Sequence, residues 1–343
     1  MSEWTVVRAP GRRRRSARGE TSAPRIRYTD RKLYDADSPA KDADSLAKDH
    51  VRSHIATLRR SAWWTTLRSA VETAIPAESS AKPAELVCFG LGSIYGSANA
   101  RWQLACALLL RECLLDGQGP SDAPDADRSA PARDAVLPVR VFDPVLSADE
   151  HKLLQSEFYC EPISHNESGA RGVSGEPDGI TVFFMPHCPF SLYCNVLRAN
   201  WGDDLSRLVI VGNSFSSYDE RTVRTEERCA LKQRRLGAPS RFATLLCDLC
   251  SCVSPLRQDP SNAVLRVLPY IREISCDPGQ LQGQPQHVGE VPLSSDESAA
   301  IEQAFTDTSV MWCPRPLLAS APAAMLADPP PPRKPGNGRD EAT

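Results

Sequence analysis

Four short apolar runs separated by helical segments constrain the fold of this chain more than any other feature. The runs are 86–89, 139–142, 181–185 and 208–211, and most of their positions are apolar. Strands that are apolar on both faces are typical of a parallel sheet that helices cover on both sides. Because right-handed crossovers join parallel strands, the pattern predicts an α/β fold with a Rossmann-like, doubly wound, mostly parallel sheet.

Helices are expected between and before these runs. Segments 98–113 and 192–201 have apolar residues at helical spacing, and Ser147 with Glu150 forms a capping-box pattern at the start of a further helix. A repeat near helical spacing from Ser45 to Ile75 predicts an N-terminal amphipathic helix of about thirty residues, which Pro76 ends.

Composition divides the chain into one folded unit and two tails. Residues 1–44 and 328–343 lack apolar periodicity and are expected to be disordered, so 45–327 is expected to form a single Rossmann-like domain. Within it, 117–138 is predicted to be a loop, because it is rich in Asp, Pro and Ala. The proline run 329–332 is either a ligand for aromatic-lined grooves or a stiff solvated end.

Positive charge is concentrated in the N-terminal tail. Residues 1–32 hold ten Arg or Lys against three acids, a balance of +7, whereas the whole chain has −3, which leaves −10 for the rest. The folded domain is therefore not expected to bind nucleic acid. The densest cluster is a candidate nuclear import signal, with a solvated tail as the alternative, and consists of Arg12, Arg13, Arg14 and Arg15.

The expected location is cytoplasmic, with a nuclear fraction. No stretch reaches the roughly 18 apolar residues of a membrane-spanning helix, and the first residues lack the apolar core of a secretory signal. We therefore expect no membrane association. Twelve cysteines in a reducing compartment are interpreted as small packed residues or ligands instead of disulfide partners.

Each apolar run ends in residues that can contact a ligand. The candidate pocket consists of Gly90, Gly92 and Ser93 after the first run, Asp143 after the second, His187 and Cys188 after the third, and Asn213 and Ser214 after the fourth. Ligands of open parallel sheets bind at the carboxyl ends of the strands. Glycines let a ligand approach the backbone, an acid can accept ribose hydroxyl hydrogen bonds, and a histidine can exchange a proton near pH 7. The pattern predicts a shared pocket and leaves the ligand and any cofactor unknown.

Each of these residues also has an ordinary structural explanation. The pattern Gly90-x-Gly92-x-x-x-Gly96 is one residue off the dinucleotide fingerprint, and Asp143 follows Gly90 by 53 positions (143 minus 90) instead of about 20. Asp143 could cap a turn, and His187 could be buried and bonded to the main chain. The sequence leaves both explanations open.

The same strand ends contribute to a family resemblance. The segments CFGLGSIYGSANARWQLACALLL, VFDPVLSADE, FFMPHCPFSLYCNVLRANW, LVIVGNSFSSYDER and FTDTSVMWCP fall between residues 86 and 314. They resemble the sensitivity-to-red-light-reduced family, and within it the animal "like" members. The resemblance implies a role in circadian clock input and, for animal members, regulation of heme biosynthesis and core clock gene expression. It implies no established catalytic activity and no catalytic residue.

The chain departs from this family pattern between Arg221 and Pro269. About 35 extra residues, roughly 224–262, are interpreted as an insertion. It contains Cys247, Cys250 and Cys252, and three thiolates are one ligand short of a tetrahedral zinc site. We therefore predict no metal site there.

The strand-end residues and the family resemblance leave two classes of function open. The first is a non-catalytic regulator with unknown protein partners. The alternative is a nucleotide- or adenosylmethionine-binding enzyme, similar to methyltransferases, that uses the carboxyl edge of the sheet. A thiol hydrolase with Cys188 as nucleophile is weaker, since no orienting acid can be named. Cys188-Pro189 and Cys313-Pro314 are also candidate thiolate heme sites, of which Cys188 is preferred, with a packed thiol as the alternative.

Overall fold

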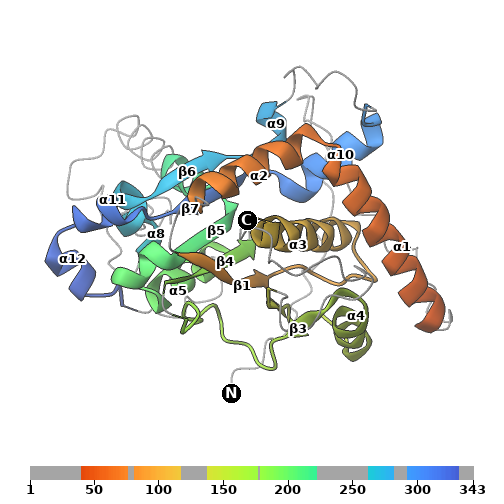
Figure 1. Ribbon diagram of the computed structural model, residues 1–343, viewed down its shortest axis with the longest axis horizontal. Helices are drawn as coiled ribbons and strands as arrows, with labels where there is room; N and C mark the ends of the chain where they lie inside the picture. Colours follow the sequence, from red (N-terminus) through yellow and green to blue (C-terminus); the bar gives the residue numbers. More distant parts are fainter. Residues whose placement is uncertain are drawn as a thin grey trace, which may run out of the picture.

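The computed structural model describes residues 40–75, 81–116, 137–176, 178–221, 262–281 and 292–331 (Figure 1). The strands are β1 (Lys82–Phe89), β2 (Val139–Phe142), β3 (Cys160–Pro162), β4 (Gly179–Met185), β5 (Leu208–Asn213), β6 (Arg272–Ser275) and β7 (Thr308–Trp312). The longer helices are α1 (Ala40–Arg59), α2 (Ala62–Ala74), α3 (Ala98–Asp116), α4 (Ala148–Phe158), α5 (Phe190–Ala199) and α10 (Ser295–Phe305). The short ones are η2 (Asp203–Arg207), α8 (Ala263–Val267), η3 (Leu268–Tyr270), α9 (Pro278–Leu281), α11 (Arg315–Ala319) and α12 (Ala323–Ala327).

The strands form one mixed, mostly parallel sheet of seven strands in the order β3-β2-β1-β4-β5-β7-β6. Strands β1 to β5 run parallel to one another, whereas β7 runs antiparallel to both β5 and β6. From β1 the chain proceeds outward through β2 and β3, and it then returns to β4 and proceeds the other way. The strand order therefore reverses between β1 and β4, and in open α/β sheets this is where ligands bind.

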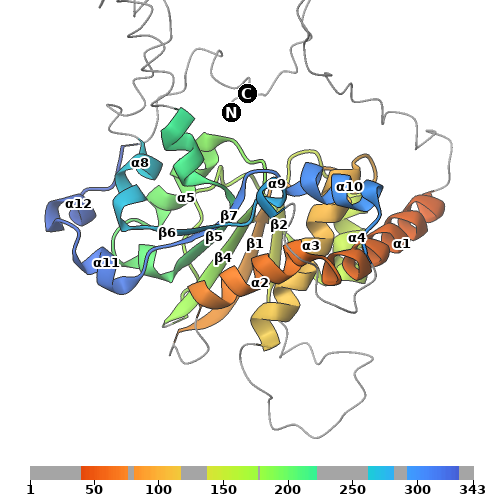
Figure 2. The same ribbon diagram turned by 90° about the horizontal axis from the view of Figure 1, so that it is seen from above.

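Helices cover both faces of the sheet, and side chains alternate between the faces along each strand. Leu86 and Cys88 of β1 pack with residues of α1, α2, α3, α4 and α10, whereas Val87 and Phe89 pack with residues of α5, α8 and α11. Figure 2 shows α2 and α3 on one side of the sheet and α5 on the other. Burial on both sides explains why β1, β4 and β5 have nearly continuous apolar sequences.

The N-terminal segment is two helices, so the prediction of one helix of about thirty residues was wrong. Helix α1 ends at Arg59, and Ser61 begins α2 by accepting a hydrogen bond from the Trp64 N–H at 3.1 Å. The Ser61 N–H bonds to the Leu58 carbonyl at 2.9 Å, which closes the corner between the helices. Helix α1 also begins at Ala40, five positions before Ser45, so residues 40–44 are helical although they were expected to be disordered.

Two other boundaries also differ from those expected. Asn262, expected within the insertion, accepts a hydrogen bond from the Leu265 N–H at 3.0 Å and caps α8. Residues 328–331, expected in a disordered tail, are described, and Pro330 is buried. Arg12 to Arg15, most of the predicted loop 117–138 and the three cysteines of the insertion lie outside the described residues.

No helix in the described parts of the chain is long and apolar enough to cross a membrane.

Candidate functional site

The turn after β1 depends on two glycines. Gly90 and Gly92 have φ values of +73° and +79°, which side chains with a Cβ adopt only at a cost. A Cβ on Gly90 would lie 2.7 Å from the Cys188 Sγ, so the turn after β4 packs directly beneath the turn after β1. These glycines therefore serve both the turn itself and the close approach of a neighbouring loop.

Asp143 joins the turn after β2 to the turn after β1. Its carboxylate accepts the Gly92 N–H at 2.8 Å and the Val145 N–H at 2.9 Å. The residue as a whole is half-buried. Asp143 caps its own turn, as one interpretation of the sequence expected, and it also fixes the glycine turn.

Glu150 strengthens the same connection from helix α4. It forms the expected capping box with Ser147, and in addition its Oε1 accepts the Ser93 hydroxyl at 2.7 Å and the Tyr95 N–H at 3.1 Å. Burial alone would raise the pKa of this carboxyl, but the hydrogen bonds from Ser147, Ser93 and Tyr95 outweigh burial and lower the pKa. The sequence predicted only the capping role of Glu150, because Ser93 lies 57 positions away along the chain.

Cys188 is buried against β1. Its Sγ lies 3.3 Å from the Phe89 carbonyl, and the residue is 4% exposed. Burial, followed by the nearby Asp143 carboxylate, raises the pKa of the thiol well above its ordinary value. An axial ligand of heme must be an accessible thiolate. Cys188 is a buried, protonated thiol that bonds to the main chain, so it does not fit this role.

His187 adopts a left-handed backbone conformation at the end of β4. Its φ is +56°, and its N–H donates to the Asn213 Oδ1 at 2.8 Å. The ring Nε2 lies 3.0 Å from the Ala304 carbonyl. Since a carbonyl only accepts, Nε2 must carry the proton, which leaves Nδ1 of the neutral ring as an acceptor. The residue is exposed, in contrast to the buried histidine that one interpretation expected.

Asn213 and Ser214 join the end of β5 to its surroundings. The Asn213 N–H donates to the Tyr193 hydroxyl at 2.8 Å, and its Nδ2 donates to the Tyr218 hydroxyl at 3.3 Å. Ser214 accepts the Ser217 N–H at 3.0 Å, which caps the helical segment 215–221. The four strand ends are thus joined in a row, from Asp143 through Gly92 and Cys188 to His187 and Asn213.

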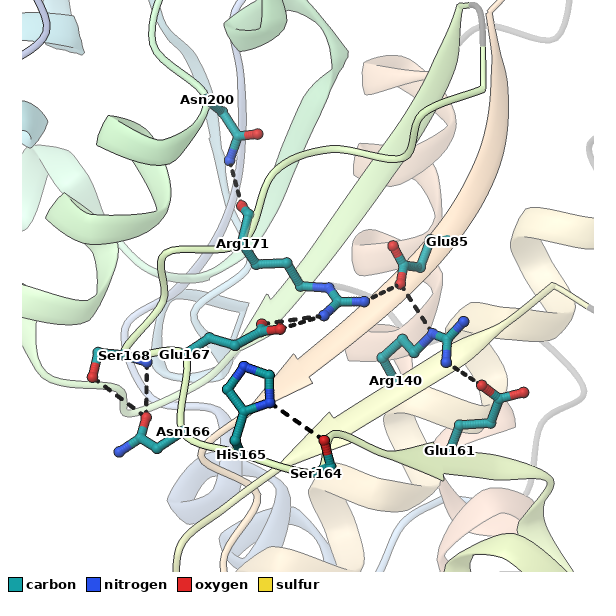
Figure 3. A network of polar contacts seen from close by, with 10 residues as sticks. All are labelled: Glu85, Arg140, Glu161, Ser164, His165, Asn166, Glu167, Ser168, Arg171 and Asn200. Atoms are coloured by element: carbon teal, nitrogen blue, oxygen red, sulfur yellow. Dashed lines mark hydrogen bonds and ion pairs between the residues drawn. The ribbon is translucent and has the colours of Figure 1, made fainter.

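A second polar cluster, which the sequence analysis missed, lies on β1 and β2 (Figure 3). Glu85 is 8% exposed, accepts a hydrogen bond from Arg171 at 2.8 Å and forms an ion pair with Arg140 at 3.3 Å. Arg171 also binds Glu167, and its carbonyl accepts the Asn200 Nδ2 at 2.9 Å. The cluster holds the segment between β3 and β4 against the sheet. Arg140 is a charged residue inside the apolar run 139–142, and this is the sequence signal that could have revealed the cluster.

Within the described residues, no group of three or more His, Cys, Asp or Glu side chains is placed to hold a metal ion.

Comparison with known proteins identifies the family. The SRR1 domain model matches residues 50–312, which is more than half of the chain. The chain belongs to the SRR1 domain family. It is 33% identical over 244 residues to the SRR1-like protein of Mus musculus, an alignment that covers 64% of this chain and 88% of the mouse protein.

Relatives of this chain also occur in a plant and in an insect. The chain is 38% identical over 151 residues to Protein SENSITIVITY TO RED LIGHT REDUCED 1 of Arabidopsis thaliana, covering 43% of this chain and 46% of the plant protein. It is 27% identical over 157 residues to the SRR1-like protein of Drosophila melanogaster, covering 43% and 48%. No solved structure matches the chain.

Proposed function

We propose that this SRR1 family member is a non-catalytic regulator of circadian clock input that takes part in the control of heme biosynthesis and core clock gene expression. Family membership supports this proposal, together with a plant relative whose name refers to sensitivity to red light. The hydrogen bonds among the strand ends add support. Asp143, Cys188 and Asn213 each bond to the main chain of a neighbouring turn, as expected of a rigid scaffold.

A rescue experiment in cells of the source organism tests the regulator. Loss of the protein should alter the period or amplitude of clock gene transcripts and the heme content, and the wild-type chain should restore both. A His187→Gln variant should restore them equally well, because the scaffold does not need proton exchange at Nδ1. Unchanged rhythms and heme content in cells without the protein would refute the proposal.

We also propose a cytoplasmic protein with a nuclear fraction and with protein partners. The basic run Arg12 to Arg15 supports the nuclear fraction. Replacing all four with Ala should lower the nuclear fraction, as measured by fractionation, without changing the melting temperature.

The alternative is an enzyme that binds a nucleotide or adenosylmethionine on a Rossmann-like sheet. The strand order supports it, since it reverses between β1 and β4, where ligands of open α/β sheets bind. Asp143 follows β2 and lies beside the Gly92 N–H. Its carboxylate supports the alternative, because an acid near the glycine turn can accept hydrogen bonds from ribose hydroxyls. Calorimetric titration with adenosylmethionine, ATP and NAD is the test. If the alternative is right, one of these ligands should bind. Its affinity should fall about tenfold in Asp143→Asn, which is a loss of about 1.4 kcal/mol of binding free energy.

A further inference from the structure

The turn after β1, residues 90–97, is closed by carboxylates of the chain itself. Where such a glycine turn binds a phosphate group, its main-chain N–H groups and those of the following helix donate to the phosphate oxygens. Here the Gly92 N–H donates to the Asp143 carboxylate at 2.8 Å, and the Tyr95 N–H donates to the Glu150 Oε1 at 3.1 Å. Two acids therefore occupy donors that a phosphate group would need.

Other donors of this turn are also bonded within the chain. The Gly90 N–H donates to the Phe142 carbonyl at 3.2 Å, the Gly96 N–H to the Ser93 hydroxyl at 3.0 Å, and the Ser97 N–H to the Ser93 carbonyl at 3.0 Å. The Ser97 hydroxyl in turn accepts the Ala100 N–H at 3.2 Å and caps the start of α3. Both the turn and the helix that follows it thus use their donors internally.

The charge of the turn also opposes a phosphate group. Hydrogen bonds lower the pKa of Glu150, so this carboxyl is ionised at neutral pH beside the carboxylate of Asp143. The nearby Arg101 is only 6% exposed, and its Nη1 donates to the carbonyls of Ile94 and Tyr95. Arg101 therefore supports the turn from within the domain and is not placed to hold a ligand's phosphates.

A second cation, at the far end of the row of strand ends, is engaged as well. The Arg221 guanidinium carbon lies 4.6 Å from the centre of the Tyr218 ring, and its Nη2 is 3.4 Å from the Asp307 Oδ2. The charge of Arg221 is thus offset by Asp307, and a polyphosphate would have to compete with this ion pair.

Two side chains of the row can accept hydrogen bonds from a ligand. Asp143 accepts the N–H groups of Gly92 and Val145, and a carboxylate has about four lone-pair sites, which leaves about two for a ligand. His187 is exposed, and because its Nε2 proton faces the Ala304 carbonyl, its Nδ1 is an acceptor. Acceptors of this kind suit hydroxyl and amino groups, and they repel phosphate oxygens.

We propose that this edge of the sheet binds a phosphate-free nucleoside, neutral or cationic, whose ribose hydroxyls donate to Asp143. The inference rests on the ligand-binding alternative above and names its ligand class, which is adenosine or adenosylmethionine and not ATP or NAD. A ribose offers two adjacent O–H donors to the acid that follows β2. A phosphate group, in contrast, would have to displace Asp143 or Glu150 from the turn.

Isothermal titration calorimetry of the full chain with adenosine, adenosylmethionine, ATP and NAD tests the ligand class. At about 50 mM salt, ATP and NAD should bind at least about tenfold more weakly than the tighter of the two phosphate-free ligands, because like charges repel. Salt at about 0.5 M screens this repulsion and should narrow the difference.

Asp143→Asn separates the contact with ribose from the repulsion of phosphate. Its amide oxygen can still accept the Gly92 N–H, so the turn is preserved. The substitution should weaken the phosphate-free ligand about tenfold and should also narrow its advantage over ATP, because one negative charge is lost. Asp178→Asn is the control: this exposed acid directly precedes β4 at the opposite edge of the sheet, and its loss should change neither affinity. Thermal melting shows whether both variants are folded.

The possible failures have different meanings. If ATP or NAD binds as tightly as the phosphate-free ligands, the ligand class is wrong although the ligand-binding alternative holds. If none of the four ligands binds, both the alternative and the inference are refuted. If a phosphate-free ligand binds and Asp143→Asn does not weaken it, the ligand lies elsewhere and the inference is overturned.

Discussion

Tyr193 connects two strand ends at the carboxyl edge of the sheet. Its fully buried hydroxyl donates to the Met185 carbonyl and accepts the Asn213 N–H, so it joins the ends of β4 and β5. A Cβ on Gly212 would lie 2.6 Å from that hydroxyl and 3.0 Å from the Met185 carbonyl. The strand end thus requires a glycine for space, although its φ is not positive.

At this scale we predict that Gly212→Ala lowers the free energy of unfolding by about 2 kcal/mol, because the methyl group must displace Tyr193 or the backbone of β4. Chemical denaturation measures the change. Gly172→Ala is the control, since a Cβ there meets nothing within 4 Å, and it should change the free energy by less than about 0.5 kcal/mol. Equal effects of the two substitutions would show that β5 is not packed as described.

At the scale of elements, α1 is attached to the domain by contacts with three neighbours. The His54 ring stacks on Trp102 of α3 with centroids 3.8 Å apart, and Lys48 forms an ion pair with Glu157 of α4 at 3.3 Å. Asp44 accepts a hydrogen bond from the Tyr95 hydroxyl in the turn after β1. Helix α1 therefore contacts the turn that contains Gly92 and Ser93 of the candidate site.

The His54 stack makes the docking of α1 depend on pH. Burial, followed by the charge of Arg101, lowers the pKa of His54 to about 4, whereas the unfolded chain takes up this proton near 6.5. Stability should therefore be lost as the pH falls from 6.5 toward 4, since the unfolded state binds the proton first. The neighbouring His50, whose pKa is also lowered, chiefly by burial, acts in the same direction.

We predict that His54→Phe, which keeps an aromatic ring on Trp102, reduces this loss. Between pH 7 and pH 5 the wild type should lose about 1 kcal/mol more stability than the variant, once solvent screening at this half-buried position is allowed for. Urea denaturation at both pH values is the measurement. If the wild type and the variant lose the same free energy of unfolding between pH 7 and pH 5, the pH dependence comes from other groups.

At the scale of the whole molecule, the contacts at both ends of the domain define its boundaries. Asp44 and Pro330 each bond to the body, although both fall in segments that the sequence indicated to be tails. A chain of residues 40–331 should therefore melt within about 2 °C of the full-length protein. A chain of residues 45–327 should melt several degrees lower, because the loss of about 2 kcal/mol shifts Tm by roughly 4–8 °C in a domain of this size.

Differential scanning calorimetry of the three chains is the test. If 45–327 melts at the full-length temperature, the contacts of Asp44 and Pro330 contribute nothing to stability. A lower melting temperature of 40–331 would instead show that residues 1–39 or 332–343 stabilise the domain.

Local sequence patterns were enough to locate the strands that are buried on both faces. The runs at 86–89, 139–142, 181–185 and 208–211 all lie within observed strands, and the capping box of Ser147 and Glu150 is present. Apolar periodicity and helix caps are local properties, so they can be derived from neighbouring residues. The eight candidate site residues also follow from strand ends, which a parallel sheet brings to one edge.

The pairing of the other strands and the role of each polar group depend on contacts between distant parts of the chain. Strands β3 and β6 are short and lie at the edges of the sheet, and β7 runs against β5, which no local pattern specifies. The contacts of Glu150 with Ser93, of His187 with Ala304 and of Arg198 with Pro330 join residues 57, 117 and 132 positions apart. Such contacts depend on how the whole chain folds back on itself, and a one-dimensional pattern contains no record of that.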